Sequence, residues 1–146
     1  MSKVQELINK LKKEGSINNQ EQAILKIIRQ NESIALDLNT NQLFEGKDCN
    51  NQVIQPPYSI MTIEIKKYKG QPYDRVTLRN EGEFYQKFTL LAEKFPVMFD
   101  SMSFKTPDLT EKYGTEIFGL TENNKAEFVE EIKPEVQEYY SKLVRV

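Results

Sequence analysis

Apolar side chains recur at helical spacing at both ends of this 146-residue chain, and this periodicity constrains the fold more than any other feature. The first stripe has lysines between its members and Gly15 just past its end, which predicts an amphipathic helix of about three turns. A second stripe predicts a longer helix, capped by Asn18 or Asn19 and broken partway by Asn31 and other polar residues. The members of the two stripes are Val4, Leu7, Ile8 and Leu11, and then Ile24, Ile27, Ile28, Ile34, Ala35 and Leu38. Such stripes are most often core, and less often a contact with a neighbouring subunit.

The C-terminal stripe predicts a helix that starts at Glu122 and is capped by Thr121. Its apolar members are Phe128, Val129, Ile132, Val136, Tyr139, Tyr140 and Leu143. Because the stripe continues in phase past Pro134, we expect a kinked helix or two abutting helices there, rather than a helix end.

Between these ends, residues 39–57 are polar and rich in turn formers, which predicts a long loop that is either a contact arm or disordered. Ser59 then predicts the cap of a helix that starts near Ile60 and is ended by Gly70 and Pro72.

The next residues predict a short strand and a tight turn. Arg75 to Arg79 alternates like a strand, and Asn80 is typical of a helix cap. Gly82 has two interpretations: a turn that needs a positive φ or close packing against backbone, or the first turn of a helix that begins at Asn80. The two interpretations predict opposite effects of an alanine at position 82.

Residues 87–93 and 97–103 are rich in Phe, Thr, Leu, Val and Met, which predicts a β-hairpin with Pro96 in its turn or on an edge. Pro107 predicts the start of a short helix that runs to Tyr113 and is ended by Gly114.

These segments predict one α+β domain over residues 1–146, a length suited to a single core. N-terminal helices and a C-terminal helix pack on a small antiparallel sheet with a β-hairpin, and the long polar loop lies in between. The domain divides into a helical N-terminal part (1–38), the loop (39–57), a central helix plus hairpin (58–106) and C-terminal helices (107–146).

The residue inventory favours a protein without catalytic chemistry. Cys49 is the only cysteine and the chain has no histidine, which excludes an internal disulfide, a thiolate–imidazole zinc site and a Ser-His-Asp nucleophile. We expect no enzyme activity and no catalytic, metal or cofactor-binding residue. A charged N-terminus and the lack of a long apolar run predict a cytoplasmic start and no membrane contact.

One local cluster of cations has two interpretations, because the net charge of −2 gives no overall attraction to nucleic acid. Its members, interleaved with Tyr68 and Tyr73, are Lys66, Lys67, Lys69, Arg75 and Arg79. They are either the solvated end of a helix or a phosphate-binding patch with aromatic rings for base stacking, as in a nucleic-acid-binding accessory protein.

Two short motifs lie in the last two thirds of the chain. The first consists of Tyr58, Ser59, Thr62, Lys66, Lys67, Gly70, Leu78, Arg79, Gly82 and Phe84. The second is an aromatic–Gly–Leu–Thr–acidic entry into the last helix, with Phe118, Gly119, Leu120, Thr121 and Glu122. Together the two motifs resemble the virion-morphogenesis or tail-completion family of tailed bacteriophages. The chain departs from the family pattern at Glu81, at Lys87 and at 114–116. It is also similar to phage proteins from Bacteroides-type gut bacteria.

The resemblance implies a small structural subunit of the phage neck or tail end, which acts in tail completion or head–tail joining. Such subunits assemble as a ring, contact neighbouring neck or tail proteins and use no cofactor. The implied location is the virion, after assembly in the host cytoplasm. Contact with DNA is a further, weaker expectation.

Overall fold

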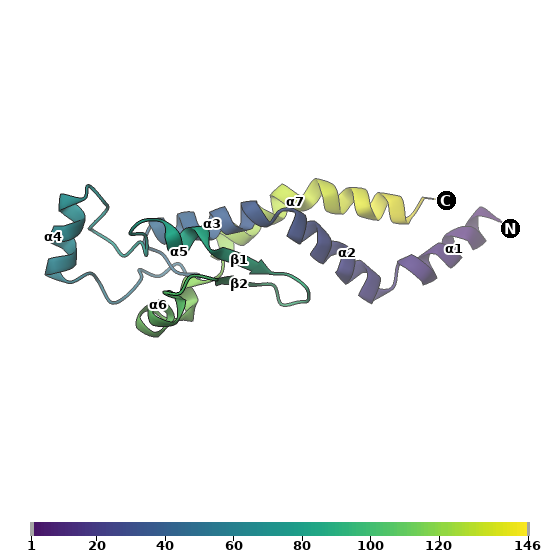
Figure 1. Ribbon diagram of the computed structural model, residues 1–146. Helices are drawn as coiled ribbons and strands as arrows, with labels where there is room; N and C mark the ends of the chain where they lie inside the picture. Colours follow the sequence, from purple (N-terminus) through teal and green to yellow (C-terminus); the bar gives the residue numbers. More distant parts are fainter. Residues whose placement is uncertain (1, 146) are drawn as a thin grey trace.

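The computed structural model, which describes residues 2–145, is an elongated α+β molecule with α4 at one end and both chain termini near the other (Figure 1). The predicted fold class is confirmed. The helical elements are α1 (Lys3–Glu14), α2 (Ile17–Gln30), α3 (Glu32–Phe44), α4 (Ile60–Tyr68), α5 (Glu83–Gln86), α6 (Thr106–Tyr113), a 3-10 turn η1 (Thr115–Ile117) and α7 (Glu122–Leu143). The strands are β1 (Phe88–Leu91) and β2 (Met98–Ser101).

The N-terminal helices differ from the prediction in cap and in number. Ser16, rather than Asn18 or Asn19, caps α2, because its hydroxyl accepts a hydrogen bond from the Asn19 amide at 3.2 Å. Asn31 separates α2 from α3, so the predicted single long helix is wrong. The Asn31 side chain donates to the Ile27 carbonyl at 2.8 Å, and such a local bond competes with a continuous helix.

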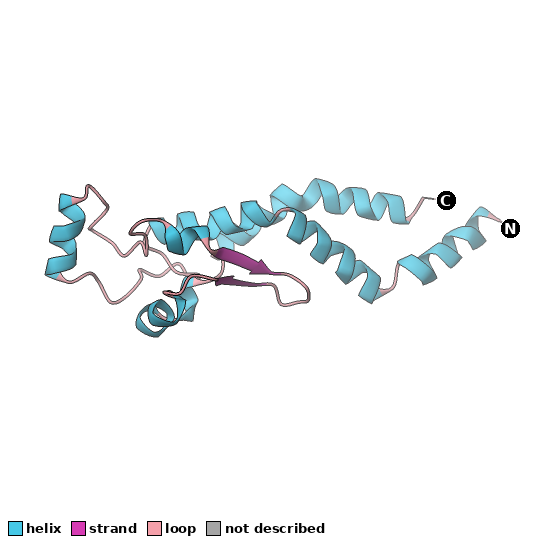
Figure 2. Cartoon of the chain, viewed as in Figure 1, coloured by secondary structure: helices cyan, strands magenta, loops and turns pink. Residues whose placement is uncertain are grey.

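Helix α3 continues to Phe44, so the predicted loop boundary at residue 39 is wrong. The polar side chains of Asn39 and Gln42 are buried and hydrogen-bonded to the 117–121 segment, which explains why a polar sequence forms a packed helix here. Beyond Phe44, residues 45–59 contain no helix or strand, and this segment and 69–82 connect α4 to the rest of the molecule (Figure 2).

The C-terminal predictions are largely confirmed. Strands β1 and β2 form an antiparallel hairpin in which Phe88 pairs with Ser101 and Leu91 pairs with Met98. Pro96 lies in the connection, as predicted. Helix α7 is one helix that contains Pro134, so the alternative of two abutting helices is wrong.

Buried apolar side chains form two clusters. The helical cluster joins α2, α3 and α7 through Leu25, Ile27, Ile28, Ala35, Ala92, Leu120, Phe128 and Ile132. The central cluster joins α3, α5, β1 and η1 and contains Leu43, Ile54, Val76, Leu78, Phe84, Phe88 and Ile117. Helix α4 contributes no apolar side chain to either cluster, and its one buried residue is Lys66. Helix α4 therefore projects from a core that it does not help to form.

Candidate binding end around helix α4

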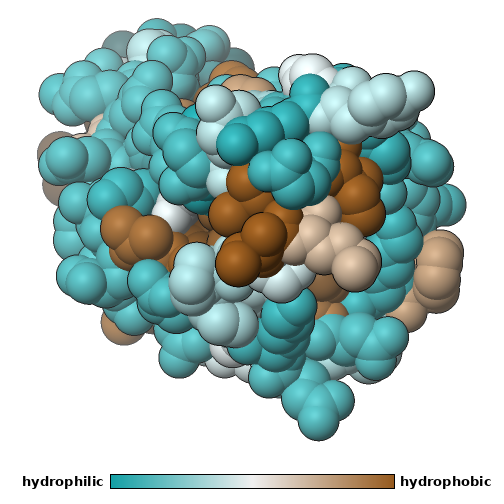
Figure 3. Space-filling view, turned by 90° about the vertical axis from the view of Figure 1, so that its left-hand side faces the viewer, coloured by the Kyte–Doolittle hydropathy of each residue, from teal (hydrophilic) through white to brown (hydrophobic). Residues whose placement is uncertain are grey.

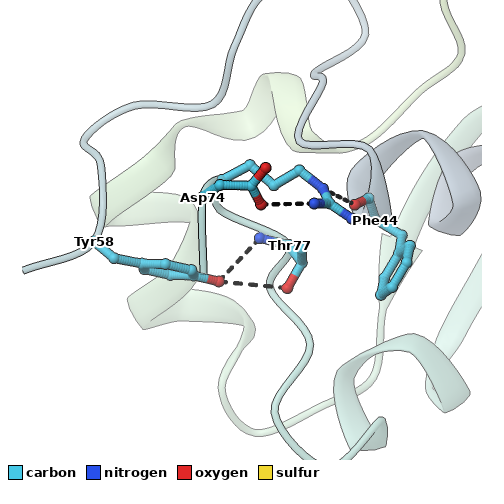
Figure 4. A network of polar contacts seen from close by, with 5 residues as sticks. Phe44, Tyr58, Asp74 and Thr77 are labelled. Atoms are coloured by element: carbon cyan, nitrogen blue, oxygen red, sulfur yellow. Dashed lines mark hydrogen bonds and ion pairs between the residues drawn. The ribbon is translucent and has the colours of Figure 1, made fainter. Parts of the chain in front are cut away.

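The segment of Arg75 to Arg79 is not a strand, because side chains rather than a neighbouring strand bind its backbone. The Thr77 amide donates to the Tyr58 hydroxyl at 2.9 Å (Figure 4). The Tyr85 hydroxyl donates to the Thr77 carbonyl. Leu78 has a φ of +57°, a left-handed conformation that ends any extended run. Burial raises the pKa of Tyr85, with a smaller contribution from Tyr58, so its phenol stays protonated and able to donate.

Lys66 connects α4 to the loop that follows it. The ammonium group donates to the Arg79 carbonyl at 3.2 Å and to Gln71 Oε1 at 3.4 Å, and it lies 4.9 Å from the centre of the Tyr58 ring. The side chain is buried, so these contacts replace the water that the charge has lost. Lys66 is therefore a structural cation, and it is not available to a phosphate group.

Arg75 has a similar internal role at the end of α3. Its Nε donates to the Phe44 carbonyl at 2.7 Å, and its Nη1 lies 2.7 Å from Asp74 Oδ1 (Figure 4). The guanidinium also lies 5.2 Å from the centre of the Phe44 ring. A cation at the C-terminus of a helix interacts favourably with the helix dipole, so Arg75 stabilises the end of α3.

The other three predicted cations lie at the surface. Lys67 is 3.5 Å from Glu64, and Lys69 donates to Asn80 Oδ1 at 3.1 Å. Arg79 is exposed. The structure thus divides the predicted cluster into two buried or half-buried structural cations and three surface cations, and the phosphate-binding interpretation now depends on the second group alone.

The outer face of α4 is apolar, a feature that the sequence reasoning did not find. Ile60, Met61, Ile65 and Tyr68 fall on one side of the helix at 100° per residue, and Ile60 and Tyr68 are 82% and 94% exposed. Glu64 lies on the same side, where it pairs with Lys67, so the face is apolar except at this one position. The view from this end of the molecule shows hydrophobic side chains grouped within a hydrophilic surround (Figure 3). The spacing of the apolar residues within Ile60–Tyr68 is a sequence signal for this face. The interpretation of this segment from its sequence considered only the charge of its lysines.

The remaining motif positions shape the backbone. Gly82 has a φ of +87° and precedes α5, so the positive-φ interpretation is confirmed and the helix cap predicted at Asn80 is wrong. A Cβ at Gly82 would lie 3.9 Å from Arg79 Nε, its nearest neighbour, so the expected collision with backbone is wrong and the constraint is conformational. Gly70, with a φ of +70°, follows α4, and Thr62 donates its amide to Ser59 as predicted for a cap.

The second motif is held by the two buried amides of α3. Asn39 Oδ1 accepts from the Gly119 amide at 2.9 Å, and Gln42 Oε1 accepts from the Thr121 amide at 3.0 Å. Leu120 is buried in the helical cluster, and Thr121 caps α7 by accepting from the Asn124 amide at 3.2 Å. Gly119, Leu120 and Thr121 therefore position α7. Phe84 is likewise buried, in the central cluster.

No protein family, curated protein or solved structure matches this chain. None of the helices within residues 2–145 has both the length and the apolarity needed to cross a bilayer. Across the same residues, no group of three or more acidic or cysteine side chains is placed to bind a metal ion.

Proposed function

We propose that this protein is a structural, non-enzymatic subunit of the phage neck or tail end, and that it acts in tail completion or head–tail joining as a member of a ring. The observation that carries the proposal is the exposed apolar face of α4. Large exposed apolar patches on soluble proteins mark interaction sites, because leaving such surface in water is unfavourable.

The residues of the first motif support this role by building α4 and its attachment. Ser59 caps the helix, Gly70 lies just beyond its end, and Tyr58 and Lys66 bind the loop that returns from it. The motif thus holds an apolar helix face away from the core, where a neighbouring neck or tail protein can bind it. Tyr58, Lys66 and Arg75 are bonded to backbone groups, which favours positioning over chemistry.

Location in the particle is the direct test of this proposal. Mass spectrometry of purified virions should detect the chain, and electron microscopy should place it at the head–tail junction with rotational symmetry. Particles from a phage whose gene is deleted should accumulate as heads and tails that do not join. A chain that is absent from virions, with a deletion that leaves joining intact, would refute the proposal.

A nucleic-acid-binding accessory role is the second candidate, and the surface cations around α4 favour it. Lys67 and Lys69 flank Tyr68 in the sequence, and the exposed ring of Tyr68 could stack on a base. Arg79 is the third exposed cation of the predicted cluster. Since Lys66 and Arg75 are engaged internally, at most three phosphates would be neutralised, and log K should fall against log salt with a slope of about −3 for duplex DNA. Gel shifts over a salt series test this, and no binding at low salt eliminates it.

A further inference from the structure

A second apolar surface lies away from α4, as an open groove of about 1190 Å³. The groove lies between the β1–β2 hairpin, the 115–120 segment and the start of α7. Side chains that line it include Leu90, Phe99, Phe118, Leu120 and Phe128. The groove is therefore continuous with the helical cluster, since Leu120 and Phe128 belong to both.

The size and the rim of the groove favour a polypeptide as its occupant. Small-molecule sites are usually about 300–1,000 Å³ and enclosed, whereas this groove is larger and open. Met98, Met102 and Val129 line it and are mostly exposed. Methionine side chains are flexible and polarizable, which suits them to packing against an irregular partner.

The charge around the groove is opposite to that around α4. Asp100 and Glu122 line the groove with Lys125, and residues 107–146 contain nine acidic and five basic residues. Burial, and then the carboxylates of Asp48 and Glu116, raise the pKa of Cys49, another lining residue. Residues 61–79, in contrast, contain five basic residues, two of them internal, and two acidic residues.

We propose that α4 of a second copy of this chain packs its apolar face into this groove, so that copies associate head to tail. Helix α4 has nine residues and is about 13.5 Å long, a short amphipathic element of the kind that binds in apolar grooves. The two surfaces lie on different parts of the molecule, so the contact is heterologous and generates a closed ring or a filament. The inference rests on the proposed function, because it names the neighbour that α4 binds within the ring.

Two single substitutions test the contact by complementation. Ile65→Asp places a charge on the α4 face, and Val129→Asp places one in the groove. Sedimentation velocity should show oligomers for the wild type and monomers for each variant. An equimolar mixture should form dimers and nothing larger, because only one functional α4 and one functional groove can then meet. Ile17→Asp, at an exposed position on α2, is the matched control and should leave the oligomers unchanged.

Cross-linking keeps the test decisive if an aspartate variant does not fold. Cys49 lines the groove and is the only cysteine, so Ile65→Cys adds a second thiol on α4. A bismaleimide should produce a ladder of multimers from Ile65→Cys, but at most dimers from the wild type and from Ile65→Cys combined with Cys49→Ser. A wild type that stays monomeric at all concentrations, aspartate variants that still assemble, or no ladder above the controls would overturn the inference.

The α4–groove contact and the proposed function can each be refuted without the other. A chain found in the virion that does not self-associate through α4 refutes this contact alone. A chain that assembles head to tail but is missing from virions supports the contact and refutes the role in the neck.

Discussion

The junction between α3 and α7 and the attachment of α4 use the same kind of bond in opposite surroundings. At the junction, Asn39 and Gln42 bind the backbone of 117–121 from within the core, where they are 0% and 3% exposed. At the α4 end, Tyr58 and Lys66 also bind backbone, but the helix that they attach buries no apolar side chain. We infer that the first set of bonds stabilises the whole domain, whereas the second positions one projecting element.

The largest expected effect is that of Asn39→Ala. The substitution removes the partner of the buried Ile117 carbonyl and of the partly buried Gly119 amide, and an unsatisfied buried group costs about 1–3 kcal/mol. We expect the free energy of unfolding to fall by about 2–5 kcal/mol, measured by urea denaturation. Asn41→Ala, at an exposed position on the same helix, is the control and should change stability by less than about 0.5 kcal/mol. Equal effects of the two would mean that the buried amide adds nothing to the junction.

A smaller and more local effect is expected from Lys66→Met, which keeps the buried stem and removes the ammonium group. Loss of the bonds to Arg79 and Gln71 should cost about 1.5–3 kcal/mol of local stability, so exchange of the α4 amides should speed up at least tenfold. Amides of α3 and α7 should keep their protection. Lys67→Met, on the exposed side, is the control. Faster exchange throughout the chain would show that α4 unfolds together with the core. The bonds of Lys66 would then stabilise the whole domain, contrary to the inference above.

The smallest of the three effects concerns Gly82, which leads from the α4 loop into the central cluster. Gly82→Ala should lower the free energy of unfolding by about 1–2 kcal/mol, because alanine is strained at a φ of +87°. Gly82→Asn should cost less, since asparagine tolerates left-handed conformations. Thermal melts of the two variants provide the measurement. A higher midpoint for alanine would show that no positive φ is required there.

Much of the fold could be predicted from the sequence, because its signals act over a few residues. Ser59 and Thr121 cap the helices that follow them, and Pro107 lies in the first turn of α6. The hairpin was predictable from its composition and from Pro96. Each of the helix signals depends on a backbone group within about four residues, so no tertiary contact was needed to read it.

The tertiary structure alone decided where the polar and charged residues lie. Asn39 and Gln42 were predicted to lie in a loop, because the partners that allow them to be buried, at 117–121, are almost 80 positions away in the sequence. Arg75 to Arg79 has the alternation of a strand, but Tyr58, Lys66 and Tyr85 satisfy its backbone instead of a neighbouring strand. The bond to the Arg79 carbonyl makes Lys66 a structural cation, and the bond to the Phe44 carbonyl does the same for Arg75. Neither of the two interpretations of the cation cluster predicted these internal roles. A polar side chain can be exposed, or buried with a distant partner, and only the packed chain supplies that partner.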